Sequence, residues 1–158
     1  MKRRSMYTLM IVVTGVMAVG IAGIFLLSLT AARPADLGVH GGRLSDLPST
    51  PNCVSSYATD ELHSIQPLTF EGDPARALAK VRDLVHNMAG ATLVETKYNY
   101  LHVEFRSPFF RFVDDAEFCL DAHANQIHFR SASRTGHSDL EVNRTRMERI
   151  RKLFQRAQ

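Results

Sequence analysis

The chain has 158 residues, enough for one domain with a hydrophobic core and an additional segment. Its formal net charge of +3 comes from its first part: four of the 19 Lys and Arg residues precede residue 34, and all 16 Asp and Glu residues follow it. The remainder therefore carries 15 basic against 16 acidic residues. Since a general nucleic-acid-binding role needs a basic face across the domain, we expect no nucleic-acid partner.

Residues 7–29 form an apolar segment without charges, preceded by Lys2, Arg3 and Arg4. In a helix this length crosses a bilayer core of about 30 Å, and it exceeds the apolar stretch of a secretory signal peptide. The positive-inside rule keeps the basic run in the cytoplasm. We predict a single-pass inner-membrane anchor with the C-terminal domain outside the cytoplasm, in the periplasm if the source is Gram-negative. Cleavage after the small residues 30–32 stays open as the alternative.

The chain divides into three parts. Residues 1–32 are predicted to be a cytoplasmic stub and transmembrane anchor, residues 33–70 an irregular tether or arm, and residues 71–158 an α+β domain. Pro and Gly interrupt the middle part so often that no period is sustained. Because so long a structureless stretch is unusual in a compact domain, we expect its first third to be a tether and the rest to be docked.

Residues 73–88 are predicted to form a helix, with Asp73 as N-cap, Pro74 in the first turn and Gly90 after its end. Four strands are predicted at residues 91–97, 100–107, 113–122 and 126–133, where apolar and polar side chains alternate most clearly in the last three. The last helix is predicted to run from residue 139 to near the C-terminus. Ser138 and Glu141 match the capping box that begins many helices.

The order α-β-β-β-β-α predicts a two-layer α+β domain with a four-stranded antiparallel sheet and two helices on its apolar face. The other face of the sheet is polar and either open or covered by the arm. A turn at residues 124–125 would place Asp121 opposite His128, and Cys119 opposite Arg130. The same register places Asp115 opposite Arg134, which pairs opposite charges.

This polar face is the strongest candidate site. One interpretation is a solvated lattice of salt bridges. The other is a recognition surface on which Arg130 and Arg134 bind a carboxylate or phosphate, helped by free amides at the start of the last helix. The candidate ligand-binding residues on the strands and the last helix are Arg106, Asp115, Glu117, Arg130, Ser131, Ser133, Arg134, Asn143 and Arg144.

The two cysteines, Cys53 and Cys119, leave a disulfide and free thiols equally open, since an oxidising compartment permits pairing. Cys53 is also a weak candidate nucleophile, although the spacing selects none of the seven His residues as its base. No zinc-binding pattern is present in the sequence. We therefore expect neither a metal nor a cofactor, and an enzyme is the less favoured class.

Several motifs in one order resemble the family called domain of unknown function 1499, from about residue 37 to the C-terminus. They are "LGVHGGRL", "PSTPNCVSS", "YLHVEFRS", "FVDDAEF" and "RSASRTGHSDLEVNRTR". The motif positions fall on Asn52, Cys53, Ser55, Ser56, Arg106, Asp114, Asp115, Glu117, Arg130, Ser131, Ser133, Arg134, Ser138, Asp139, Asn143 and Arg144. The resemblance thereby adds Asn52 and Cys53 to the candidate ligand-binding residues.

The chain departs from this family at two positions. Leu47 stands where relatives often have a second cysteine, so a local disulfide to Cys53 is excluded. Glu141 stands where relatives often have Gly. The family brings no assigned activity, so the function has to be inferred from the residues.

The sequence is compatible with three functions. The leading hypothesis is a membrane-anchored extracytoplasmic binding or accessory module, whose polar sheet face holds an anionic small molecule or an envelope protein. The second is an envelope enzyme that uses Cys53 as nucleophile. The third is a structural scaffold in which the polar lattice only stiffens the domain.

Overall fold

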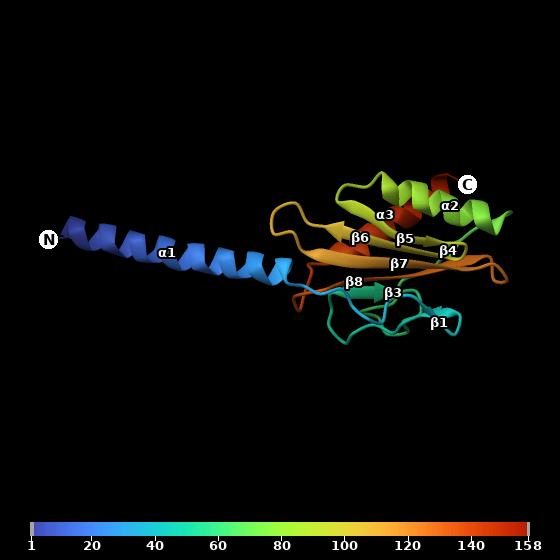
Figure 1. Ribbon diagram of the computed structural model, residues 1–158, viewed down its shortest axis with the longest axis horizontal. Helices are drawn as coiled ribbons and strands as arrows, with labels where there is room; N and C mark the ends of the chain where they lie inside the picture. Colours follow the sequence, from blue (N-terminus) through green and yellow to red (C-terminus); the bar gives the residue numbers. More distant parts are fainter. Residues whose placement is uncertain (1, 158) are drawn as a thin grey trace.

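A long helix, α1 (Lys2–Leu29), projects from one end of an α+β domain in the computed structural model, which describes residues 2–157 (Figure 1). Nearly all of its described side chains are exposed, and Ser28 near its end is buried. Its length and composition suit a membrane span, and a signal sequence near the N-terminus would fit the same description. The predicted apolar helix is thus confirmed as a helix that could be an anchor or a signal sequence.

The domain is built on one antiparallel sheet, in which the four predicted strands lie side by side in chain order. The prediction of four strands is nevertheless wrong, because the sheet has six and both additional strands come from the arm. Each of the two pairs with the last strand, so the arm protects an edge that would otherwise be open. The strands are β3 (Cys53–Ser55), β4 (Leu68–Thr69), β5 (Ala91–Lys97), β6 (Tyr100–Arg106), β7 (Val113–Asp121) and β8 (Gln126–Ser133).

Two helices, α2 (Pro74–His86) and α3 (Val142–Arg156), cover the apolar face of the sheet, and the arm covers the other face (Figure 1). Helix α2 begins as predicted, because the Asp73 carboxylate accepts a hydrogen bond from the amide of Ala75 at 2.8 Å. The core between helices and sheet includes Val81, Val85, Phe118, Phe129, Met147, Ile150 and Phe154. The arm also carries a small hairpin of β1 (Val39–His40) and β2 (Arg43–Leu44).

Helix α3 begins later than predicted, and its predicted capping box is wrong. Leu140 and Glu141 both have positive φ angles, 55° and 62°, so the chain turns before the helix starts. Glu141 makes no side-chain cap, and Asp139 instead of Ser138 accepts the 2.7 Å hydrogen bond from the amide of Asn143. A left-handed conformation suits Gly, which is the residue that the resemblance places at position 141.

The register between β7 and β8 differs by two residues from the prediction. A four-residue loop, 122–125, joins the strands, because the Asp121 carboxylate accepts the amide hydrogens of residues 123 and 124. Glu117 therefore lies opposite Arg130, and Asp115 lies opposite Ala132. The predicted cross-strand pairs Asp121–His128, Cys119–Arg130 and Asp115–Arg134 are therefore wrong. The predicted faces are right, because a shift of two residues keeps every side chain on its side.

Candidate functional site

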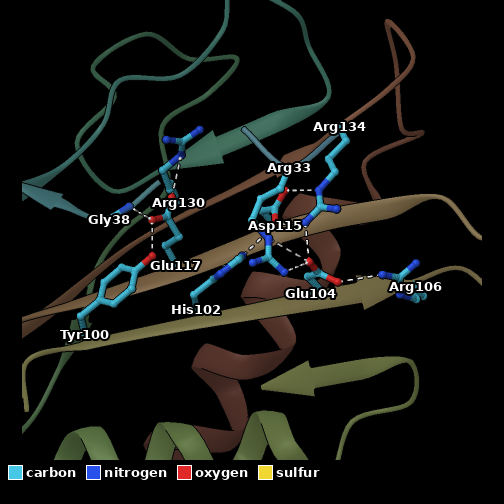
Figure 2. Close-up of polar contacts among 10 residues, drawn as sticks. All are labelled: Arg33, Gly38, Tyr100, His102, Glu104, Arg106, Asp115, Glu117, Arg130 and Arg134. Carbon is cyan, nitrogen blue, oxygen red and sulfur yellow. Dashed lines mark hydrogen bonds and ion pairs between the residues drawn. The ribbon is translucent and has the colours of Figure 1, made fainter. Parts of the chain in front are cut away.

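The polar face of the sheet lies beneath the first part of the arm, where β6, β7 and β8 direct charged side chains toward it (Figure 2). Of the two expected arrangements, open or covered, the structure has the covered one: these side chains are mostly buried. We call the group around the guanidinium of Arg134 the Arg134 lattice. It consists of Arg33, His102, Glu104, Arg106, Asp115 and Arg134.

Glu104 on β6 is the centre of this lattice, because its carboxylate contacts three arginines. The Nη2 atoms of Arg33 and Arg134 each lie 2.6 Å from Oε1, and Nη2 of Arg106 lies 2.9 Å from Oε2. Burial by itself would raise the pKa of Glu104, but the hydrogen bonds from Arg33 and Arg134 outweigh it and lower that pKa to about 2. Glu104 is therefore ionised at neutral pH.

Asp115 on β7 forms the second half of the lattice. Its carboxylate accepts two hydrogen bonds from Arg134, both at 2.7 Å, and lies 2.7 Å from Nε2 of His102. Burial opposes ionisation, but the hydrogen bonds from Arg134 and His102 hold the pKa of Asp115 below its usual range. The centre of the lattice is buried, and Asp115 and Glu104 hold Arg134 there from two sides.

A second cluster centres on Glu117 of β7, whose side chain is fully buried. Its Oε1 accepts hydrogen bonds from the hydroxyl of Tyr100 and the amide of Gly38, both at 2.6 Å. Its Oε2 has no hydrogen-bond partner among the described residues, and Nε of Arg130 lies 3.4 Å from it. Burial, followed by the hydrogen bond to Glu117, raises the pKa of Tyr100.

Arg130 on β8 has much weaker partners than Arg134. Its side chain is 4% exposed, yet within residues 2–157 it makes a single hydrogen bond, 3.4 Å from Nη1 to Oδ2 of Asp36. A guanidinium has five N–H donors in a planar fork, so most of these donors have no protein acceptor. Arg130 also lines a cleft of about 510 Å³ between the arm and the end of β8. Other residues lining this cleft, which we call the Arg130 cleft, include Asp36, Asp46, Asn52 and Arg134.

Four other predicted site residues direct their side chains to partners away from Arg130 and Arg134, although Ser133 is also among the residues that line the cleft. The Ser131 hydroxyl donates to Oδ1 of Asn143, and the Ser133 hydroxyl donates to Asp114 at 2.6 Å. Nη2 of Arg144 donates to the carbonyl oxygen of residue 62 at 2.7 Å, which holds the arm against α3. The side chains of Asn143 and Arg144 thus do not contact Arg130 or Arg134.

Several residues of these clusters are not among the candidates predicted from the sequence. Arg33 and Asp36 are in the arm, and they reach partners 71 and 94 positions away. No local pattern in the sequence signals such contacts. Tyr100 is a further residue that was not predicted. It lies opposite Cys119, which is on the same face of the sheet as Glu117, so strand alternation could have placed it near Glu117.

Cys53 and Cys119 are both free, buried thiols. The Cys53 thiol donates to the carbonyl oxygen of Thr50 at 3.1 Å, and Nε2 of His63 lies 3.2 Å from the same oxygen. Nδ1 of His63 lies 2.7 Å from the Asp60 carboxylate. The structure thus places one histidine near Cys53, but both ring nitrogens of His63 face acceptor oxygens instead of the thiol.

The environment of Cys53 does not favour a nucleophile. Burial is the main cause that raises the pKa of Cys53 to about 11, and nearby Asp139 and Asp60 add to it, while Arg130 acts in the opposite direction. A catalytic thiol needs a lowered pKa. Within residues 2–157, no group of three or more His, Cys, Asp or Glu side chains could hold a metal ion.

We expect Cys53 to react with iodoacetamide far more slowly at pH 8 than a free cysteine, because burial shields the thiol and less than about one molecule in a hundred is then a thiolate. The rate of mass gain in a Cys119→Ser variant of the whole chain measures this reaction. Adding denaturant should restore the ordinary rate. Fast labelling of the folded protein near pH 7 would contradict the buried thiol and favour the nucleophile hypothesis.

Comparison with models of protein families gives a match over most of the chain. The family model described as "Protein of unknown function (DUF1499)" matches residues 43–154, which include all strands of the sheet and most of α3. No curated protein and no solved structure matches the chain. The matched segment contains Glu104, Asp115, Glu117, Arg130 and Arg134, whereas Arg33 and Asp36 precede it. The chain belongs to the DUF1499 family of proteins of unknown function.

Proposed function

We propose that this protein is a membrane-anchored accessory module outside the cytoplasm, and that its Arg130 cleft binds the anionic group of a small molecule. Support for the anchor comes from α1, which begins with a basic run and continues as a long apolar segment. Membrane orientation follows from the positive-inside rule, which keeps that run in the cytoplasm. The domain would then act in the periplasm or its equivalent.

The observation that carries the binding proposal is the difference between two arginines on one face. Asp115 and Glu104 hold Arg134 at 2.6–2.7 Å, so we assign it to the stabilising lattice. Arg130 is as deeply buried, but its protein contacts are 3.4 Å long. Burying a charge without good partners is costly. An anion that accepts two hydrogen bonds from the Arg130 fork would offset this cost.

The rim of the cleft limits the class of ligand. Asp36 and Asp46 line the same cleft as Arg130, so a compound with several negative charges would be repelled. A compound with one carboxylate or phosphate, together with hydroxyl or ammonium donors for the rim carboxylates, fits better. A protein partner on the polar face is less favoured, because the arm already covers that face.

The test is a native mass spectrum of the full chain, extracted from its membrane in a mild detergent without reductant. The proposal predicts an extra mass on the wild-type protein that an Arg130→Gln variant loses. An Arg106→Gln variant is the matched control, because Arg106 is on the same face but is not among the residues lining the cleft, so the extra mass should remain. If Arg130→Gln does not fold, Arg130→Lys keeps the charge but removes the fork and should weaken the capture.

Two results would contradict the proposal. A bare mass for the wild type would favour the scaffold hypothesis, in which the charges only stiffen the domain. The same extra mass on wild type and Arg130→Gln would place the ligand elsewhere.

A further inference from the structure

Two exposed aromatic side chains mark the loop between β6 and β7. Phe109 is 84% exposed and Phe110 is 39% exposed, and both are in residues 107–112. Removing a phenylalanine side chain from water is favourable, so two neighbouring exposed phenylalanines favour an apolar environment. The loop itself is closed by the amide of Ser107, which donates to the carbonyl of Phe112 at 2.9 Å.

This loop is at the end of the domain where α1 joins it (Figure 1). Residues 30–32 are all that separate α1 from Arg33, whose guanidinium is held by Glu104 near the end of β6. A chain that advances at most 3.3–3.6 Å per residue places Arg33 within about 14 Å of the last residue of α1. The end of β8 lies at this end of the domain as well, because the amide of Arg134 donates to the carbonyl of Val113 at the start of β7.

The surroundings of the two phenylalanines resemble those of a segment that lies at a membrane surface. Arg33, Arg106 and Arg111 are at the same end, and each of them is at least partly exposed. Leu140, in the connection between β8 and α3, is 89% exposed. Aromatic side chains flanked by basic residues are enriched at the boundary between headgroups and acyl chains.

We propose that residues 107–112 insert Phe109 and Phe110 into the surface of the bilayer that α1 crosses, so that the domain is held against the membrane at two points. This inference rests on the anchor in the proposed function. The headgroup region is about 5–8 Å thick on each side, and the loop lies at the end of the domain that residues 30–32 connect to α1 (Figure 1). The basic residues would contact anionic headgroups while the two rings lie deeper.

The far end of the domain offers a matched control. Tyr98, in the turn between β5 and β6, is 88% exposed, and thus as exposed as Phe109. It lies at the opposite end of β6 from the loop (Figure 1). The proposal therefore predicts lipid contact at position 109 and none at position 98, although the two aromatic side chains are equally exposed.

The test uses the full chain in vesicles of phosphatidylethanolamine and phosphatidylglycerol. Single cysteines at Phe109→Cys, Tyr98→Cys or Val16→Cys, in a chain whose Cys53 and Cys119 are replaced by Ser, carry an environment-sensitive fluorophore. Lipids with a spin label near the headgroup should quench the fluorophore at 109 and leave that at 98 bright. Lipids labelled deep in the acyl chain should quench the fluorophore at 16, within α1.

The outcomes separate this inference from the proposed anchor. Quenching at 16 with equally bright probes at 109 and 98 would overturn the inference and keep the anchor. No quenching at 16 would overturn the anchor itself. Since cysteine at 109 removes one ring, a second series places the label at Arg111→Cys. Changing both phenylalanines to Ser in that chain should then reduce the quenching, and an unchanged signal would contradict the insertion.

Discussion

Replacing Arg134 with Gln is expected to lower the free energy of unfolding by about 3–5 kcal/mol, the usual loss when one partner of a buried ion pair is removed. Two carboxylates, Glu104 and Asp115, would lose hydrogen bonds of 2.6–2.7 Å while they remain buried under the arm. Gln cannot supply the charge or the fork of donors. A protein of ordinary stability, about 5–15 kcal/mol, would be brought close to unfolding.

Urea unfolding of the full chain in detergent, followed by near-ultraviolet circular dichroism, measures this loss. Arg106→Gln is the matched control, since Arg106 also donates to Glu104 but its side chain is 38% exposed. An exposed pair contributes about 0–1 kcal/mol. Similar losses for the two variants would contradict the view that the Arg134 lattice is closed and buried.

The pH dependence of stability provides a second check on the same lattice. Glu104 has a lowered pKa of about 2, and the pKa of Asp115 is also below its usual range. Groups of this kind stabilise the fold fully above their unfolded pKa values, near 4, and the contribution is lost as the pH falls toward the folded values. Wild-type stability should therefore decline between about pH 5 and pH 2. In Arg134→Gln this pH-dependent contribution should be smaller.

Replacing Gly90 with Ala is expected to cost about 2–4 kcal/mol, as the sum of backbone strain and a steric clash. Gly90 connects α2 to β5 with a φ of 77°. A Cβ atom there would lie 2.5 Å from the carbonyl oxygen of Arg106, which belongs to the backbone and cannot move aside easily. The same turn is fixed by a 2.9 Å hydrogen bond from the amide of Arg106 to the carbonyl of Gly90.

Gly72→Ala separates the two causes. Gly72 has a similar φ of 84°, but a Cβ atom there would meet nothing within 4 Å. The Gly72→Ala variant should therefore lose only the stability that backbone strain costs, about 1–2 kcal/mol. Thermal unfolding of the two variants measures the difference. Equal losses would show that the contact with Arg106 contributes nothing.

Local signals in the sequence predicted the central elements well. Asp73, Pro74 and Gly90 delimit α2 because capping and turn chemistry act over a few residues. Alternation located β6, β7 and β8 and separated the polar face from the core, since each side of a strand meets one environment. The alternation therefore predicts the common face of Asp115 and Glu117, which lie opposite Glu104 and His102 of β6.

Contacts over long sequence distances were not predictable in this way. β3 and β4 have three and two residues, too few to show alternation, and they exist only because β8 offers an open edge. The register of β8 depended on loop length, which Asp121 sets through its own hydrogen bonds. The start of α3 depended on two residues with positive φ, and only the Gly that relatives often carry at position 141 gave a sign of this turn.

The candidate site shows the same division. The sequence placed Arg130 and Arg134 on one face, but their different roles depend on which side chains the structure brings to each. Arg134 meets two carboxylates of the sheet, whereas Arg130 meets Asp36 from the arm at a long distance. Ser131 and Ser133 follow the alternation to the opposite face, where their hydroxyls bond to Asn143 and Asp114.

A crystal structure of the full chain purified from its own membrane would show directly whether the Arg130 cleft holds a ligand. We expect Arg134 to be paired with Asp115 and Glu104, and non-protein density to lie within hydrogen-bond distance of the Arg130 fork. An Arg130 that closes onto both oxygens of Glu117, beside a cleft filled by water alone, would contradict this expectation. The charges of this face would then stabilise the domain and bind no ligand.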